Sequence, residues 1–201
     1  EHDKMWLMIE TQSLQNELIG KYSFTKKETE FFVSHFTERK VKKRQFIIQP
    51  DFIANYRVFV VKGTFKAYVI GNDGQENTIS LAMDGWWISD PNSYIYQQPA
   101  TMFVEALEDS IIFQLDYENE QILKAHSHKF ETFFRTVAER GLAFMQRRLI
   151  ASLTLTAEER YEQFAQRNPD FLQRVPQFTI ASYLGMTTQY LSRIRKKKTK
   201  S

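Results

Sequence analysis

The sequence predicts an α+β protein in which two helical regions flank a region of short β-strands. Three observations predict this order. Apolar side chains recur with the helical period near the N-terminus, and short β-branched and aromatic runs separated by turns follow them. Residues 116–153 then return to a helical pattern with no proline and one glycine. Short strands with turns every 8–12 residues or so are typical of a β-barrel or sandwich.

The composition is that of a globular chain, and it excludes several chemistries. Hydrophobic residues make up 42% of the 201 residues, which is enough apolar matter for a sizeable core. There is no cysteine, so disulfides, cysteine-ligated zinc, iron–sulfur clusters and thiol catalysis are excluded. No apolar run approaches the ~18 residues of a membrane span. We therefore expect a cytoplasmic protein with no membrane contact.

The N-terminal region is predicted to be helical. Thr25 followed three residues later by Glu28 is a capping box, which marks the start of a helix. A charged stretch, Glu38 to Arg44, is expected to close this region. The apolar residues with helical spacing are Leu7, Leu14, Leu18 and Ile19 before the capping box, and Phe31, Phe32 and Phe36 after it.

The middle region is predicted to form strands joined by tight turns. Residues 58–61 form a β-branched and aromatic run that ends at Gly63, and residues 65–70 alternate between two faces. Asn72-Asp73-Gly74 is a hairpin turn, because Asp and Gly tolerate positive φ. The return strand contains Thr78, Ile79 and Leu81, and two further strands are expected at Thr101–Leu107 and Ser110–Leu115.

Residues from about Asp116 to Leu153 read as one helix of roughly 50 Å. Within it, selected residues recur at alternating spacings of four and three, which is the heptad spacing of a coiled coil. We expect this seam to pair two copies of the chain. The alternative is a helix that packs on its own barrel. The predicted seam consists of Phe130, Phe134, Val137, Gly141 and Phe144, and Arg148 interrupts it.

The most specific pattern is a helix-turn-helix within Thr179–Arg195. Ala181 is the small residue needed where the two helices cross, and Gly185 allows positive φ in the turn. Thr187 can cap the second helix. Four large apolar residues are expected to pin the two helices together: Ile180, Leu184, Leu191 and Ile194. An ordinary helical hairpin would also fit this core, but it would not explain the polar and basic outer face of the second helix.

That outer face has the residue types that recognise DNA. Arginine can bond guanine through two hydrogen bonds, and glutamine can do the same with adenine. The predicted base-reading residues are Thr188, Gln189, Ser192 and Arg193. The predicted phosphate contacts are Thr187, Arg195, Lys196, Lys197 and Lys198.

Charge is distributed unevenly along the chain. The formal net charge is +3, but residues 147–201 carry eleven Lys and Arg against four Asp and Glu. The last sixteen residues, 186–201, contain six bases and no acid. A basic end on an otherwise acidic chain indicates a polyanionic partner. A solvated tail that only aids solubility is the alternative.

Several stretches resemble the Crp/Fnr family of bacterial transcription regulators over roughly residues 20–198. They are residues 58–63, Asp73-Gly74-Gln75-Glu76, residues 157–161, Arg174-Val175-Pro176, residues 180–185 and residues 191–195. The resemblance implies an N-terminal β-roll like that of cyclic-nucleotide-binding domains, a long dimerisation helix and a C-terminal helix-turn-helix domain. The boundaries expected are 1–115, 116–153 and 154–201. It also implies transcription regulation, with double-stranded DNA and a second copy of the chain as partners, and it leaves room for RNA polymerase and an unidentified small-molecule effector.

One departure from the family concerns its effector. Members that bind cyclic nucleotides carry Gly-Glu before a short helix and Arg-Ser/Thr-Ala after it. Here Gly85 is followed by Trp86, the later stretch reads Pro99-Ala100-Thr101-Met102, and no Lys or Arg lies between Gly85 and Gln121. We therefore expect no response to cyclic AMP, unless Lys62 or Lys66 points inward. The candidate pocket for an apolar or uncharged effector is Trp86, Trp87, Ala100 and Thr101; the alternative is that the two indoles fill the core.

Three other functional classes compete with this interpretation. A cupin-like enzyme needs metal ligands on its strands, but His2, His35, His126 and His128 lie outside the predicted strands. No nucleophile–base pair or phosphate-binding glycine loop is present, so we expect no catalysis, no metal and no cofactor. The remaining two are a ligand-sensing or interaction dimer with no role on DNA, and a true cyclic-nucleotide-dependent regulator.

Overall fold

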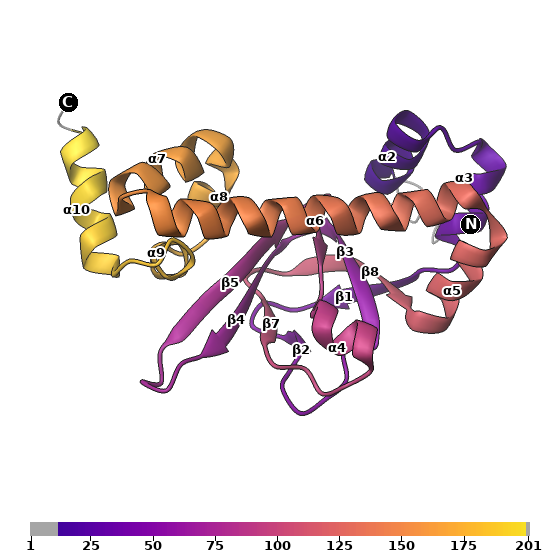
Figure 1. Cartoon of the computed structure of the whole chain (residues 1–201), viewed down its shortest axis with the longest axis horizontal. Coiled ribbons are helices and arrows are strands. Elements are labelled where there is room, and N and C mark those ends of the chain that lie inside the picture. The colour runs from indigo at the N-terminus through magenta and orange to yellow at the C-terminus, as the bar shows by residue number, and fades with distance from the viewer. Residues whose placement is uncertain (1–11, 200–201) are drawn as a thin grey trace.

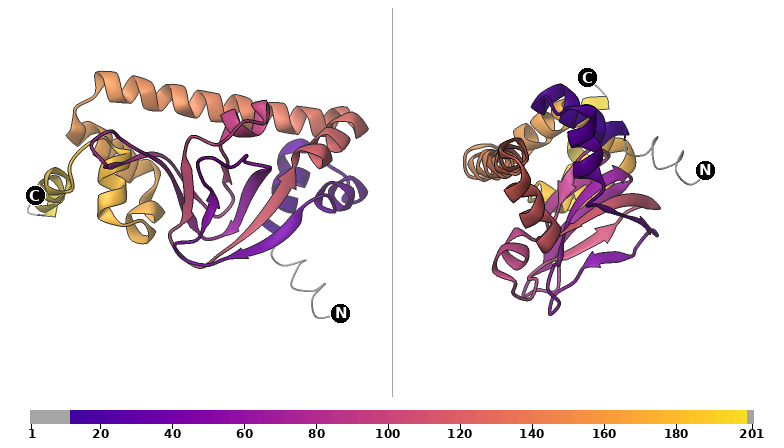
Figure 2. Two further views of the ribbon diagram at one scale, coloured as in Figure 1. Left: turned by 90° about the horizontal axis from the view of Figure 1, so that it is seen from below. Right: turned by 90° about the vertical axis from the view of Figure 1, so that its right-hand side faces the viewer.

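The computed structural model describes residues 12–199 and confirms the predicted α+β order (Figure 1). Two sheets form a roll at the centre, and one long helix, α6 (His128–Thr154), runs past it. The N-terminal helices lie near one end of α6, and the C-terminal helices lie near the other. Figure 2, which shows α6 end-on, places it beside the sheets.

Each sheet has four antiparallel strands. In order across the first sheet, the strands are β1 (Thr37–Val41), β8 (Ser110–Asp116), β3 (Tyr56–Lys62) and β6 (Trp87–Ile88). In order across the second, they are β2 (Phe46–Ile48), β7 (Phe103–Ala106), β4 (Thr64–Ile70) and β5 (Glu76–Met83).

The helices outside the roll are short, apart from α6. Those that precede α6 are α2 (Gln12–Tyr22), α3 (Lys26–Val33), α4 (Pro91–Tyr96) and α5 (Tyr117–His126). Those that follow it are α7 (Ala157–Arg167), α8 (Pro169–Arg174), α9 (Gln177–Tyr183) and α10 (Thr188–Thr199). Leu7 and the other residues before 12 lie outside the described part of the chain.

Three apolar clusters hold these elements together. The roll encloses one, which contains Val60, Phe65 and Val104. The second joins the roll to α2, α3, α5 and α6 and is built largely from phenylalanine rings. The third belongs to the C-terminal helices and also includes Leu81 of β5. The C-terminal helices therefore pack on the roll and share part of their core with it.

Two local predictions at the turns are confirmed. Thr25 and Glu28 form the predicted capping box at the start of α3, with the Glu28 N–H donating to Thr25 Oγ1 at 3.2 Å. The predicted hairpin joins β4 to β5, and Gly74 has a φ of +76°. Both signals are local in sequence, which explains why they could be read without tertiary information.

The charged stretch Glu38 to Arg44 does not close a helix, as the sequence led us to expect. Most of it forms β1, which pairs with β8. This strand lies at the edge of its sheet. Charged residues are favoured on edge strands because they discourage pairing with other chains. The charge pattern thus marks a sheet edge here.

The predicted single helix from Asp116 to Leu153 is divided at Ser127. Ser127 has an extended backbone and caps α6, because its Oγ accepts a hydrogen bond from Lys129 N at 3.2 Å. Because of this break, α5 packs against β8 and α6 begins as a separate helix. Serine is a good helix cap but also a tolerated helix residue, so the sequence pattern alone did not show the break.

The predicted dimer seam faces the chain's own roll. Phe130 and Phe134 are buried in the second cluster, Val137 packs against it, and the Phe144 ring meets Trp86 edge-on at 6.1 Å. Of the five predicted seam residues only Gly141 is exposed. The prediction that these residues pair two copies of the chain is therefore wrong. The alternative, a helix packed on its own roll, holds for them because their apolar rings are covered within one chain.

A different apolar stripe on α6 remains exposed. Leu142, Leu149 and Leu153 are 72%, 60% and 76% exposed, and Met145 lies between them. These residues fall one or two positions after the predicted seam and again follow spacings of three and four. Exposed apolar side chains grouped on one face mark an interaction surface.

A buried carboxylate ties the roll to α5. Glu120 is 1% exposed and receives hydrogen bonds from Arg57 Nε at 2.5 Å and Tyr94 Oη at 2.7 Å, while Lys124 Nζ lies 2.6 Å away. Burial alone would raise the pKa of Glu120. The hydrogen bonds and positive charge of Arg57 and Lys124 outweigh burial, so its pKa lies below the ordinary value.

This arrangement predicts a loss of stability in acid. Because the folded-state pKa of Glu120 is lowered, its contribution is complete at neutral pH and is lost as pH falls below the unfolded value of about 4.3. Glu120→Gln should cost about 3–5 kcal/mol at pH 7, because it leaves Arg57 without its buried partner. Urea unfolding of both proteins at several pH values measures this. An equal acid-side slope for wild type and variant would contradict it.

Candidate nucleic-acid interface

A tight turn sets the geometry of α9 and α10. Gly185 follows α9 with a φ of +66°, a conformation that glycine adopts readily. Met186 N donates to Ala181 O at 3.0 Å, and Gly185 N donates to Ser182 O at 3.1 Å. These two bonds form a Schellman motif, which ends a helix and reverses the chain. The turn therefore lies where the sequence predicted it.

The two helices are held together by the predicted apolar residues. Ala181 is buried at the crossing and leaves room for the second helix. The large residues predicted to pin the helices are all buried in the third cluster: Ile180, Leu184, Leu191 and Ile194. Further support comes from α7 and α8, whose buried residues in this cluster are Tyr161, Phe164 and Phe171. The second helix is thus fixed on one face and free on the other.

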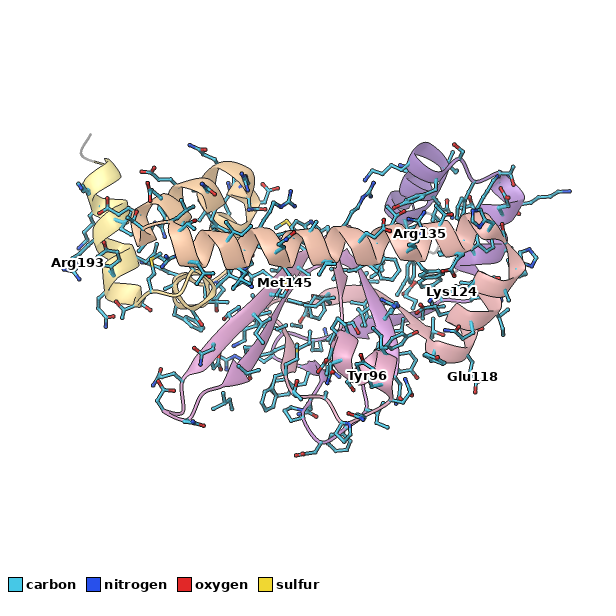
Figure 3. The ribbon with its side chains drawn as sticks, viewed as in Figure 1. Tyr96, Glu118, Lys124, Arg135, Met145 and Arg193 are labelled. Atoms are coloured by element: carbon cyan, nitrogen blue, oxygen red, sulfur yellow. The ribbon has the colours of Figure 1, made fainter. Side chains whose placement is uncertain are left out.

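The free face of α10 carries the residues predicted to read bases. Thr188, Gln189 and Arg193 are exposed, and Ser192 is half-buried. Arg193 points away from the roll at the outer side of the molecule (Figure 3). Its guanidinium lies 5.3 Å from the centre of the Tyr190 ring, which limits its range of orientations.

The start of α10 is capped as predicted. Thr187 Oγ1 accepts a hydrogen bond from Tyr190 N at 3.2 Å, so the first turn of the helix is held by a side chain. The Thr187 side chain is exposed beside this turn. Its predicted contact with a phosphate stays a prediction.

The predicted phosphate contacts continue along the same helix. Arg195, Lys196 and Lys197 are exposed. Lys197 Nζ lies 3.7 Å from Glu158 of α7, which is a weak surface ion pair. Lys196 is three residues beyond Arg193 and therefore extends the same face. The side chain of Lys198 lies outside the described part of the chain.

The helix-turn-helix is hydrogen-bonded to the roll through Ser182. Its Oγ accepts from Thr78 N at 2.9 Å and donates to Glu76 O at 2.7 Å. Both partners belong to β5. Since Ser182 belongs to α9, the first helix of the motif is attached directly to a strand edge.

A second attachment joins α8 to the roll by charge. Arg174 donates to both carboxylate oxygens of Asp84, at 2.7 and 3.1 Å, and to Glu108 Oε1 at 2.6 Å. The hydrogen bonds to Asp84, followed by those to Glu108, raise the pKa of Arg174. This role of Arg174 was not predicted from the sequence. Its partners lie 66 and 90 residues away, so no local pattern could have revealed it.

Comparison with known proteins agrees with this arrangement. Residues 38–126 match the family of cyclic nucleotide-binding domains. FixK2 from Bradyrhizobium japonicum is similar with a TM-score of 0.68 and 18% identity, over 81% of this chain and 83% of that chain. The c-di-GMP responsive global regulator CLP from Xanthomonas campestris is similar with a TM-score of 0.65 and 15% identity, over 87% and 92%. No curated protein matches this chain in sequence.

A protein from Eubacterium rectale assigned to the crp/fnr family of transcriptional regulators is also similar. Its TM-score is 0.65 and its identity 15%, over 86% of this chain and 82% of that chain. This chain has the Crp/Fnr fold. The resemblance seen in the sequence is thereby confirmed at the level of the fold, including the roll, the long helix and the C-terminal helices.

Within the Crp/Fnr fold, the four residues proposed for an effector pocket do not gather around one cavity. Trp86 packs edge-on against Phe171 of the C-terminal helices, whereas Trp87 packs in the second cluster. Trp86 precedes β6, whose first residue is Trp87, so the two adjacent indoles pack in different surroundings. Ala100 is buried in the roll cluster, and Thr101 is exposed. Of the four residues, Trp87 and Ala100 serve packing, whereas Trp86 is half-buried beside the C-terminal helices.

Cyclic-nucleotide binders of the Crp/Fnr family hold phosphate around the short helix that corresponds to α4. In this chain a carboxylate, that of Asp90, accepts hydrogen bonds there. Asp90 is fully buried, accepting from Ser93 N at 3.1 Å and from Thr101 N at 3.0 Å. These bonds join the start of α4 to the stretch after it. One backbone donor in α4 and one in the stretch after it are thus already occupied by an internal anion.

Lys66 does not supply the missing positive charge. Its side chain is buried on the face of β4 that the C-terminal helices cover, with Nζ 5.9 Å from the centre of the Phe178 ring. Glu76 and Glu105 hold it at 2.5 and 3.3 Å. The side chains of neighbouring Phe65 and Ala67 face the roll interior instead.

Among residues 12–199, no three His, Asp or Glu side chains gather closely enough to hold a metal ion. In the same range no helix is both long and apolar enough to cross a membrane.

Proposed function

We propose that this chain is a transcription regulator of the Crp/Fnr type that binds specific sites on double-stranded DNA as a homodimer. The observation that carries the proposal is the outer face of α10. It presents Gln189 and Arg193 to solvent on a helix whose other face is fixed, and residues 186–201 contain no acid. Such a helix can enter the major groove, where arginine and glutamine distinguish guanine and adenine by paired hydrogen bonds.

The basic residues of α10 complete this function. Arg195, Lys196 and Lys197 are exposed, and they would neutralise phosphates on either side of the groove. Release of counterions from those phosphates strengthens binding to any sequence and makes binding dependent on salt. Base contacts would then select the site, and phosphate contacts would hold the protein on it.

A second copy of the chain would pair through the exposed stripe of α6. The stripe comprises Leu142, Met145, Leu149 and Leu153. Burying four apolar side chains from each copy removes them from water, which favours association. Two-fold pairing would present two α10 helices to successive major grooves about 34 Å apart.

Selection of bound duplexes from a random DNA pool tests the proposal. We expect enrichment of a near-palindromic site whose two halves lie about one helical turn apart. A retained pool with no enriched sequence, or no retention at low salt, would contradict it. The latter result would favour a ligand-sensing or interaction dimer with no role on DNA.

We further propose that the regulator does not respond to cyclic nucleotides, because Asp90 occupies backbone donors of α4 and of the stretch after it, and the arginine near α4, Arg57, is already paired with Glu120. A second anion placed there would meet a buried carboxylate without a counter-charge, which is unfavourable. Isothermal titration with cyclic AMP and cyclic GMP should show no saturation below about 1 mM. A regulator that binds cyclic AMP serves as the positive control. Saturable micromolar binding of either nucleotide would restore the family's usual effector.

A further inference from the structure

A cleft of about 780 Å³ opens where the C-terminal helices meet the roll. Its walls come from the second half of α6, from α7, from the turn after α9 and from β5. This volume is in the range of sites that bind small molecules. Neither Asp90 nor the other residues of α4 line it, so it is separate from the segment where cyclic-nucleotide binders hold phosphate.

The lining of the cleft is positively charged. Four arginines line it, and no aspartate or glutamate does: the arginines are Arg147, Arg148, Arg160 and Arg167. Amide side chains that can donate or accept hydrogen bonds also line it: Asn77, Gln163 and Asn168. A concave surface with one sign of charge concentrates ions of the opposite sign.

Two of the arginines are held in place by neutral partners. Arg148 donates to the carbonyl oxygens of Ile79 and Tyr183, and its guanidinium lies 4.1 Å from the centre of the Tyr183 ring. Arg160 donates to Leu184 O at 3.0 Å. These bonds satisfy N–H groups and orient the side chains, but they do not neutralise the charges. Burial lowers the pKa of Arg148, as expected for a cation without an acidic partner.

The other two arginines are available to a ligand. Arg147 and Arg167 are exposed, and neither forms an ion pair or side-chain hydrogen bond within the described part of the chain. Arg147 belongs to α6 and Arg167 to α7, and both line the cleft. A ligand with a negative group could therefore be bound by charges that the fold does not use.

The remaining wall is aromatic. Trp86 and Phe144 meet edge-on there, and Phe164 of α7 lines the same cleft. Aromatic faces and edges favour a planar apolar group. Met145 and Leu149 also line the cleft and belong to the exposed stripe of α6, so a second copy of the chain would border the cleft there.

We propose that this cleft binds a small aromatic organic anion. The negative group pairs with Arg147 and Arg167, and the ring packs against Trp86 and Phe144. Arginine binds carboxylates and similar anions through two parallel hydrogen bonds, which lysine does not reproduce. The bound anion bridges α6 and α7 next to the attachment of the helix-turn-helix.

Isothermal titration of the full chain with 1-naphthoate tests this proposal, with uncharged 1-naphthalenemethanol and inorganic sulfate as comparison ligands. We expect saturable binding of one naphthoate per chain, and roughly tenfold weaker binding of both comparison ligands. Arg167→Gln and Arg147→Gln should each weaken naphthoate binding roughly fivefold. Lys40→Gln removes the same charge from β1, far along the chain from the cleft, and should leave binding unchanged.

Three results would overturn the proposal. They are the absence of saturable naphthoate binding, equal binding of the uncharged or inorganic ligand, and unchanged affinity in both arginine variants. Circular dichroism of each variant confirms that it is folded, which is expected because both side chains are exposed and unpaired in the fold. The measurement uses no DNA, so its outcome is independent of whether the chain is a regulator.

Discussion

Leu149→Glu is expected to convert the dimer into a monomer and to abolish most site-specific DNA binding. Leu149 lies in the middle of the exposed stripe, and pairing would place its two copies close to each other. Two carboxylates buried in an apolar contact carry a large desolvation cost and repel each other. A monomer also loses the gain from binding two half-sites at once, which is worth roughly 10²–10⁴ in affinity.

Sedimentation and a DNA titration measure the two consequences separately. Ile122→Glu is the matched control, because Ile122 is an exposed isoleucine on α5, away from the stripe. It should leave both the oligomeric state and the DNA affinity unchanged. Phe134→Ala, at a position of the originally predicted seam, should instead destabilise the monomer by about 3–5 kcal/mol. A Leu149→Glu protein that remains dimeric would show that another surface forms the contact.

Arg193→Ala is expected to lose about 1–3 kcal/mol of specific binding at each half-site. The reason is that a guanidinium able to form two hydrogen bonds with one guanine has been removed. Preference should relax at one base pair in each half-site, whereas affinity for unrelated DNA should change much less. Titrations of the selected duplex and of a scrambled duplex measure the difference.

Lys196→Ala is the companion to this variant, because it lies on the same face one helical turn later. It should weaken binding to both duplexes alike and reduce the salt slope by about one unit. Each variant removes one positive charge from α10, so the comparison separates base recognition from phosphate binding. If both variants lost the same affinity on the two duplexes, the roles assigned to Arg193 and Lys196 would be wrong.

The helix-turn-helix could be predicted residue by residue because its determinants are local. Ala181, Gly185 and the buried apolar residues fall within fifteen positions, and each has a separate steric reason to be there. The same holds for the capping box at Thr25 and the hairpin at Gly74. In each case the backbone conformation depends on neighbours in sequence.

The dimer surface could not be predicted in the same way. On a helix with 3.6 residues per turn, adjacent positions can both follow spacings of three and four. Phe130 and Leu142 belong to two such series, and only tertiary packing decides which series the roll covers. The sequence favoured the aromatic series as the dimer seam. In the structure these large rings instead fill the space between α6, the roll and the N-terminal helices.

The predicted effector pocket was wrong for a related reason, because tertiary packing separates its residues. Trp86 and Trp87 are adjacent in sequence, but Trp86 precedes β6 and packs against the third cluster, whereas Trp87 begins β6 and packs against the second. The absence of the family's Glu and Arg was readable from the sequence. The sequence did not show that Asp90 accepts a hydrogen bond from Thr101 N. The two residues are eleven positions apart, and the folded chain brings them together around α4.

If two copies of this chain bind one DNA site through α10, both half-sites must contribute to affinity. The affinity and stoichiometry of the protein are measured on the selected duplex and on the same duplex with one half-site scrambled. We predict two chains per selected duplex and a loss of roughly 10²-fold or more when one half is scrambled. One chain per duplex, or equal affinity for both duplexes, would contradict the account.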